Sequence, residues 1–192
     1  LLVNNAGFGI SGAVEFTDPA DARAQMDVNF FGALHCIQAV LPGMRAAKRG
    51  HIVLVSSVAA PIAIPFQSFY SATKAAVNSL TLALRNEVKP FGVKVCAVLP
   101  GDVKTGFTAA RKKSLSGAEV YGTALEHAVA VMEHDEQNGM PPVKVAKAVL
   151  AAAGEKNPRA FRTVGFQYQL FVFLAKLLPA TWTNALVGMI YK

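Results

Sequence analysis

Cysteine is scarce in this sequence, whose 192 residues include only Cys36 and Cys96. Neither has another cysteine or a histidine nearby at metal-ligand spacing, which argues against both a disulfide-stapled scaffold and a zinc site. The pattern predicts two buried free thiols in a reducing compartment. We therefore expect a cytoplasmic protein without a bound metal.

Acidic residues are also few. The chain carries 12 Asp and Glu against 19 Lys and Arg, which gives a formal net charge of +7 and a pI of about 9.6. Such a charge fits an anionic partner, either nucleic acid or a membrane surface. Apart from the run at residues 111–113 the basic residues are dispersed, and no nucleic-acid-binding module is visible. We expect no nucleic-acid partner.

Unbroken apolar runs long enough for a spanning helix, about 20 residues, are missing as well. Residues 52–73 contain no charged residue, but they contain serines, Pro61 and Pro65, which fit a strand, a loop and a helix start. Residues 163–191 are interrupted by Lys176 and Pro179. We expect no membrane-spanning helix in either segment.

Short runs rich in Val, Ile and Leu recur along the chain, and longer segments with helical apolar spacing separate them. Strands that are apolar on both faces belong in a parallel sheet covered by helices on both sides. The sequence therefore predicts a single α/β domain over residues 1–192, with a doubly wound, Rossmann-like parallel sheet. The expected strands are 1–5, 51–57, 92–99 and 160–165, and the expected helices are 19–41, 69–89 and 142–154.

Two further segments have a composition of their own. Residues 102–140 mix glycines, charges and a moderately apolar stretch, which is typical of a mobile substrate lid. Residues 161–192 are very apolar and rich in aromatic side chains. This tail could cover the core, close a hydrophobic pocket, form a subunit contact, or lie on a membrane surface between flanking basic residues.

A glycine pattern at residues 7–12 matches the G-x-G-x-x-G dinucleotide fingerprint. A true fingerprint opens directly into a helix whose N-terminus binds the pyrophosphate. Here Val14 to Asp18 delay the helix, and the acidic residue expected about 20 positions further on is not in place. We therefore expect these glycines to let the backbone pass close beneath a cofactor, and not to bind its phosphates.

Tyr70 and Lys74 are four positions apart on a predicted helix, so their side chains project from one face. An ammonium beside a phenol favours the phenolate and lowers the pKa of the tyrosine. Ser57 lies 13 residues before Tyr70, at the carboxyl end of a predicted strand, where doubly wound sheets place their active sites. Ser56 points to the opposite face of that strand.

Together these features closely resemble the short-chain dehydrogenase/reductase family over residues 1–105. The resemblance is carried, in order, by Asn4-Asn5-Ala6-Gly7, Asn29 within DVNFFG, Ser56-Ser57, Tyr70-Ser71-Ala72-Thr73-Lys74 and Pro100-Gly101-Asp102-Val103-Lys104-Thr105. It implies an NAD(P)-dependent enzyme that interconverts a secondary alcohol and a ketone or related carbonyl. It also implies a homodimer or homotetramer, with the helices at 19–41 and 69–89 as subunit contacts.

The resemblance assigns the catalytic roles to Asn29, Ser57, Tyr70 and Lys74. Tyr70 would be the acid in ketone reduction and the base in alcohol oxidation, and Lys74 would lower its pKa and hold the nicotinamide ribose. Ser57 would bind the substrate oxygen, and Asn29 would position a water that links Lys74 to solvent. The implied cofactor-binding residues are Asn5, Ala6, Gly7, Ser56, Tyr70, Lys74, Pro100, Gly101, Val103 and Thr105.

The sequence departs from the family at its front. It has no initiating Met and no recognisable signal peptide, and the first strands and the Gly-rich phosphate turn of the family are absent. We expect a longer parent polypeptide, and we expect the 192 residues alone to be inactive. The choice between NAD and NADP, for which we expect a slight preference for NADP, is normally encoded in the part that is absent.

Two other hypotheses about function stay open at this point. The same scaffold could serve a non-catalytic nucleotide-sensing or interaction protein, since a fold does not determine a function. The chain could also be an inactive, oligomer-forming fragment. Within the enzyme hypothesis, the apolar tail is similar to branches of the family that act on lipophilic alcohols, and we expect a lipophilic small-molecule substrate.

Overall fold

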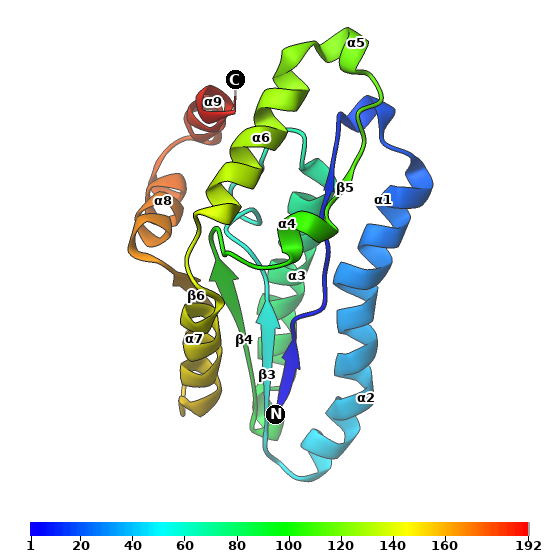
Figure 1. The fold of residues 1–192 in the computed structure, drawn as a ribbon. Coiled ribbons are helices and arrows are strands. Elements are labelled where there is room, and N and C mark those ends of the chain that lie inside the picture. The colour runs from blue at the N-terminus through cyan, green and yellow to red at the C-terminus, as the bar shows by residue number, and fades with distance from the viewer. Residues whose placement is uncertain (192) are drawn as a thin grey trace.

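The computed structural model, which describes residues 1–191, contains a parallel sheet with helices packed on both of its faces (Figure 1). The strands lie in the order β1-β3-β4-β6, and every neighbouring pair is parallel. The predicted Rossmann-like fold is confirmed, and all four expected strands form, most of them a residue or two shorter. Their bounds are β1 Leu2–Asn4, β3 Gly50–Val55, β4 Val93–Pro100 and β6 Phe161–Val164.

Alternate residues of the central strands face opposite helix layers, as the period of a β-strand requires. Ile52 and Leu54 pack with helices α2 (Gly32–Ala46) and α3 (Ser68–Glu87) in the larger core cluster. Val53 and its neighbour Cys96 pack on the other face with α7 (Pro142–Gly154). Because both faces are covered, β3 and β4 are apolar almost throughout, which is why they read as continuous runs in the sequence.

The first long helical stretch has a start that the sequence predicts and an interior that it does not. Asp18 caps α1 (Pro19–Met26) by accepting a hydrogen bond from the backbone N–H of Ala20 at 2.8 Å, and Pro19 occupies the first turn. A π-helical segment, η2 (Asp27–Phe31), joins α1 to α2. The expected end near Pro42 is wrong, because α2 accommodates this proline and continues to Ala46.

The segment expected to be an irregular lid, residues 102–140, is largely helical. It contains α4 (Phe107–Ala110), α5 (Ala118–Tyr121) and the long α6 (Thr123–Gln137), which the sequence analysis missed. Its strand β5 (Lys112–Lys113) pairs with β2 (Ile10–Ser11), so this segment is hydrogen-bonded to the front of the chain. In Figure 1 it arches over the ends to which the strand arrows point.

The apolar tail forms two helices, α8 (Phe166–Leu177) and α9 (Ala180–Ile190), which are separated at Pro179. They lie at the margin of the molecule, beyond the edge strand β6 (Figure 1). Most of their large apolar side chains are exposed. Within residues 1–191, none of the helices is both long and apolar enough to cross a bilayer.

The two cysteines differ in their surroundings. Both are free, as expected, and Cys96 is buried in the sheet. The prediction that Cys36 is buried is wrong: it lies on α2 with its side chain exposed. The neighbouring Ile37 fills the core position on that helix, and successive residues of a helix point about 100° apart.

Candidate active site

A cavity of about 810 Å³ opens at the carboxyl ends of β1, β3 and β4 and brings most of the predicted site residues together. Ligands of open α/β sheets bind at this end. Of the twelve predicted residues, Ala6 and Asn29 do not line the cavity. The ten that do are Asn5, Gly7, Ser56, Ser57, Tyr70, Lys74, Pro100, Gly101, Val103 and Thr105.

Tyr70 is the third residue of α3, so its phenol stands at the mouth of the cavity above the end of β3. Ser57, in the loop just after that strand, lines the same cavity, and its hydroxyl favours the ionised form of the phenol. The Ser57 hydroxyl also accepts a hydrogen bond from the backbone N–H of Ala59 at 3.1 Å, which fixes its position. Ser56 is buried and donates to the backbone carbonyl of Lys74 at 3.3 Å, so Ser57 is the serine that meets Tyr70.

Lys74 follows one helical turn later and is buried. Its Nζ donates to the backbone carbonyl of Val55 at 2.9 Å and lies 5.6 Å from the centre of the Tyr70 ring. Gly7 approaches from the other side: a Cβ added there would lie 3.5 Å from Nζ. The predicted pairing of an amine with a phenol on one helix face is present.

The pKa values of these two groups are governed by burial. Loss of water around the phenol raises the pKa of Tyr70 to about 12, although the nearby Ser57 hydroxyl acts in the opposite direction. Burial also lowers the pKa of Lys74 to about 8. The expected lowering of the tyrosine pKa is therefore wrong, because desolvation dominates, and Tyr70 is protonated at neutral pH.

The depressed pKa of Lys74 predicts an unusual dependence of stability on pH. Between pH 8 and 10.5 the folded protein has already released a proton that the unfolded chain still holds, so the free energy of unfolding should rise with pH. Between pH 8 and 9.5 the gain should be about 2 kcal/mol. The measurement is denaturant unfolding of the wild type and of Lys74→Met across this range. Parallel curves for the two proteins would contradict the assignment.

Asn29 lies within the π-helical segment η2 and is buried beneath the cavity. Its side chain binds both polar groups of the Phe8 peptide unit: Oδ1 accepts from the N–H and Nδ2 donates to the carbonyl, each at 3.0 Å. Nδ2 also donates to the hydroxyl of Thr73 at 3.1 Å. Asn29 thus joins the loop after β1 to α3, one residue from Lys74.

The Gly7–Gly12 pattern does not form a phosphate turn. Residues 10–11 extend into β2, a 3₁₀ turn (η1, Val14–Phe16) follows, and α1 begins only at Pro19. A Cβ added at Gly9 would lie 3.0 Å from the ring of Phe107, so the lid packs directly on this glycine. Within residues 7–12 the glycines allow other segments to pack closely on the backbone.

Comparison with known proteins agrees with this geometry. A sequence model of the family described as short chain dehydrogenase matches residues 1–116. The chain belongs to the short-chain dehydrogenase family. A 3-ketodihydrosphingosine reductase from Bacteroides thetaiotaomicron is 45% identical over 165 residues, which are 85% of this chain. The chain spans 61% of the length of that relative.

Solved structures of other short-chain dehydrogenases share the fold. One from Burkholderia phymatum, in complex with NAD, gives a TM-score of 0.76 at 25% identity over 90% of this chain and 63% of its own. One from Burkholderia cenocepacia, in complex with NADP, gives a TM-score of 0.72 at 28% identity over 100% of this chain and 70% of its own. Nicotinamide dinucleotides of both kinds thus occur among its structural neighbours.

The structure also places residues at the site of this short-chain dehydrogenase that the sequence analysis missed. Phe107 of α4 packs on Tyr70 with ring centres 5.4 Å apart, and the buried Gln67 lines the cavity just before α3. Thr73, which bonds Asn29, also donates to the Tyr70 carbonyl at 2.8 Å. Thr73 stands in the quoted Tyr70–Lys74 motif, whereas Phe107 and Gln67 carry no local signal.

A buried ion pair joins two parts of the segment 102–140. Arg111, after α4, is paired with Glu136 of α6, and neither side chain has appreciable solvent exposure. Glu136 also accepts from the hydroxyl of Thr108 at 2.7 Å and lines the cavity. The Arg111 guanidinium lies over the Phe107 ring, 5.6 Å from its centre. These contacts fix the aromatic ring that covers Tyr70.

Proposed function

We propose that this chain carries the catalytic and substrate-binding part of an NAD(P)-dependent oxidoreductase that interconverts a secondary alcohol and a ketone. The observation that carries the proposal is that Ser57, Tyr70 and Lys74 line one cavity at the carboxyl end of the sheet. A non-catalytic protein on this scaffold would have no need to keep these three groups together. Their placement supports the enzyme over the sensing module.

Tyr70 is the proton donor in the reductive direction. Its pKa of about 12 keeps the phenol protonated at neutral pH, as an acid for a ketone oxygen must be. Ser57, fixed by its bond from Ala59, donates to the same oxygen and stabilises the negative charge that develops there. Lys74, anchored on the Val55 carbonyl, holds its ammonium beside the ring and favours the phenolate left after proton transfer.

The residues present fit the nicotinamide half of a dinucleotide. A Cβ added at Gly7 would lie 3.0 Å from Asn29 Oδ1 and 3.5 Å from Lys74 Nζ, so the backbone passes close to both side chains and forms part of the cavity wall. Asn5, Gly7 and Lys74 would hold the ribose side, and residues 100–105 would hold the ring. When bound, the cofactor supplies or accepts the hydride. Both NAD and NADP fit this part of the site.

Asn29 acts through its position. Both hydrogens of its side-chain amide are engaged, one by the Phe8 carbonyl and one by Thr73. A water linking Lys74 to solvent would therefore have to bind the second lone pair of Oδ1 or the main chain of η2. We propose that Asn29 fixes the Phe8 peptide beside Lys74 and supports such a water from there.

Within residues 1–191, the glycine pattern at 7–12 opens onto no helix N-terminus that could bind a pyrophosphate. We infer that the 192 residues alone bind the dinucleotide weakly and do not turn over. The experiments below therefore use the full-length protein.

A lipophilic substrate is supported by the cavity wall opposite the polar groups. This wall is built largely from apolar side chains of the lid, α7 and the loop before α3. They include Ala59, Ile64, Phe107, Val145, Val149 and Leu150. The relative from Bacteroides thetaiotaomicron is named for a long-chain ketone substrate, 3-ketodihydrosphingosine. We propose a ketone with an alkyl chain as the substrate class.

The chain-length dependence of activity tests this proposal. With NADPH or NADH, 3-ketones of increasing alkyl length should show kcat/KM rising about fourfold for each added methylene until the cavity is filled, because each buried CH₂ contributes about 0.8 kcal/mol. The measurement is cofactor oxidation followed by absorbance. Equal kcat/KM for short and long ketones would contradict a lipophilic pocket.

The exposed apolar surface of α8 and α9 supports peripheral attachment to an anionic membrane. Phe173, Trp182 and Met189 are 58%, 64% and 61% exposed. No acidic residue occurs in the sequence after Glu155, while basic residues flank both helices. An apolar helix pair with only basic charges matches the surface of an anionic bilayer.

Co-sedimentation with vesicles tests this attachment. Replacing Phe173, Trp182 and Met189 with serine should weaken partitioning onto phosphatidylserine-containing vesicles about tenfold or more, because the inserted apolar area is lost. Val14→Ser, Phe91→Ser and Val120→Ser together form the matched control, since these exposed apolar residues lie outside the tail and outside the proposed subunit contacts. Equal partitioning of the two triple variants would contradict membrane attachment through α8 and α9.

We also propose that the full-length protein is a homodimer or homotetramer whose contacts include the helices at 19–46 and 68–87. Phe31 and Leu82 on these helices are exposed large apolar residues. Light scattering of Phe31→Asp with Leu82→Asp should show a smaller species than the wild type.

A further inference from the structure

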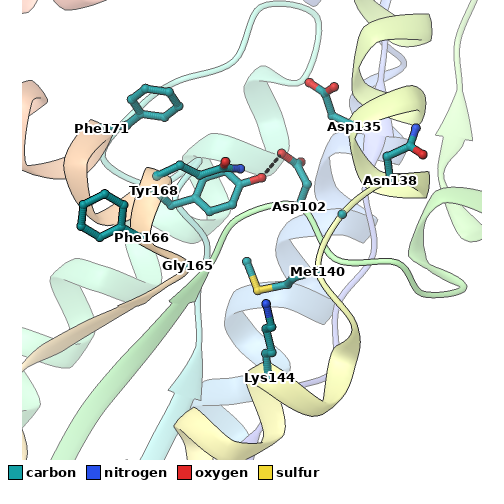
Figure 2. Close-up of a pocket in the computed structure, with 11 residues that line it drawn as sticks. Asp102, Asp135, Asn138, Met140, Lys144, Gly165, Phe166, Tyr168 and Phe171 are labelled. Atoms are coloured by element: carbon teal, nitrogen blue, oxygen red, sulfur yellow. Dashed lines mark hydrogen bonds between the residues drawn. The ribbon is translucent and has the colours of Figure 1, made fainter.

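The loop after β4 is a thin partition between two cavities. On one side it lines the candidate active site through Pro100, Gly101 and Val103. On the other side lies a second cavity of about 530 Å³, which the lid, α7 and α8 enclose (Figure 2). Asp102 lines both. Because the loop has a cavity on each side, close packing alone does not fix its position, and specific contacts are needed.

Tyr168 of α8 supplies that support. Its hydroxyl donates to Asp102 Oδ2 at 2.6 Å, the dashed contact in Figure 2, across 66 positions of sequence. The ring packs against the backbone of the loop: a Cβ added at Gly101 would lie 2.3 Å from it. Only glycine therefore fits at 101 while Tyr168 holds this place. The side chain makes both a hydrogen bond and a steric contact to the loop.

The loop is also hydrogen-bonded to Met140 through its backbone. The N–H of Met140 donates to the Asp102 carbonyl at 2.9 Å, and the N–H of Lys104 donates to the Met140 carbonyl at 3.0 Å. The loop is thus fastened to residue 140 through its main chain and to α8 through the Asp102 side chain. A substitution of Tyr168 can remove the bond to α8 while the backbone bonds to Met140 stay in place.

The surroundings of Asp102 make this bond consequential. Burial raises the pKa of its carboxyl group, and the nearby Asp135 and Glu136 act in the same direction, whereas the bond from Tyr168 opposes them. Lys144 lines the same cavity and provides a cation there. The Tyr168 hydroxyl is accordingly a principal stabiliser of the Asp102 carboxylate, and short bonds to ionised groups are the strong ones.

We propose that Tyr168 is a positioning residue that fixes the nicotinamide-facing loop through Asp102 and thereby couples the C-terminal helices to the active site. This inference rests on the proposed function, in which residues 100–105 hold the nicotinamide ring. Tyr168 does not contact the substrate or the cofactor in this proposal. It fixes the position of the loop through its contacts with Gly101 and Asp102. The apolar tail then has a second role, because α8 carries the support.

Tyr168→Phe in the full-length protein tests the inference, because it removes the hydroxyl and keeps the ring against Gly101. Amide hydrogen exchange of the peptide covering 101–105 should become about tenfold faster. The KM for NADPH should rise about fivefold to tenfold, the deuterium isotope effect on kcat should increase, and the KM for the ketone should change less than about twofold. Gln169→Ala, which removes the exposed bond from α8 to the Thr163 carbonyl, is the matched control and should leave all four quantities unchanged.

A double-mutant cycle completes the test. In an Asp102→Ala background, Tyr168→Phe should have no further effect on the exchange rate or on the KM for NADPH, because its partner is gone. Additive effects, or wild-type exchange and KM in Tyr168→Phe alone, would overturn the inference even if the ketone is reduced. If the wild type reduces no ketone, the proposed function fails, and the exchange rates still decide whether Tyr168 fixes the loop.

Discussion

Tyr70→Phe should abolish turnover while leaving the dinucleotide bound. The substitution removes only the hydroxyl, so the ring keeps its contacts with Phe107 and with the Lys74 ammonium. The ketone oxygen then loses its proton donor, and the Ser57 hydroxyl remains as a lone hydrogen bond to it. General acid catalysis contributes about 10²- to 10⁴-fold, and we expect a loss of at least about 10³-fold in kcat.

Single-turnover kinetics with NADPH and a long-chain ketone measure the effect, and titration of NADPH fluorescence measures binding. The dissociation constant of NADPH should stay within about threefold, because the ring that borders the cavity is unchanged. Ser57→Ala is an informative companion: it should lower kcat by about 10²-fold, as loss of one donor to a developing oxyanion does. Undiminished turnover in Tyr70→Phe would remove the mechanism.

Glu136→Leu should produce the largest loss of stability. The Arg111 side chain is fully buried, and its Nε and Nη1 already lack partners among the described residues. Removing its one carboxylate leaves a buried charge without compensation, which costs about 3–5 kcal/mol. Because Thr108 loses its acceptor as well, α4 should detach from α6 and Phe107 should leave Tyr70. Urea unfolding measures the stability, and the KM for the ketone reports the lid.

Two comparisons separate this effect from an ordinary surface change. Glu133 lies on the same helix as Glu136 and pairs with Lys113, whose side chain is 45% exposed. Glu133→Ala breaks this exposed pair and should cost less than about 1 kcal/mol. Arg111→Met combined with Glu136→Leu should recover most of the lost stability, since an apolar pair can replace a buried ion pair. If the single and double variants were equally unstable, burial of an unpaired charge would not be the cause.

The residues of the active site could be predicted because their motifs resemble those of a known family, and because several of them stand at the ends of predicted strands. Tyr70 and Lys74 are one helical turn apart, Ser57 follows an apolar strand, and residues 100–105 follow the next. Parallel strands place such ends together, so ten of the twelve predicted residues line one cavity. The same reasoning excluded Gly7–Gly12 as a phosphate turn, because the helix starts too late.

Other features depend on contacts between segments far apart in the sequence. The pKa of Tyr70 rises to about 12 because the folded protein removes water from the phenol, whereas the spacing of Tyr70 and Lys74 alone predicted a decrease. The glycines and charges of residues 102–140 suggested an irregular lid, and the apolar face of α6 became apparent only where Leu125 and Met132 are buried.

By itself the sequence determined the parallel α/β fold and the covered strands, because these depend on hydrophobic periodicity, and it indicated the Ser57, Tyr70 and Lys74 set through motifs that resemble a known family. Only the tertiary structure decided the burial of Arg111 against Glu136, the packing of Phe107 on Tyr70 and the bond from Tyr168 to Asp102. These contacts join residues 25, 37 and 66 positions apart, and their existence depends on how whole helices pack.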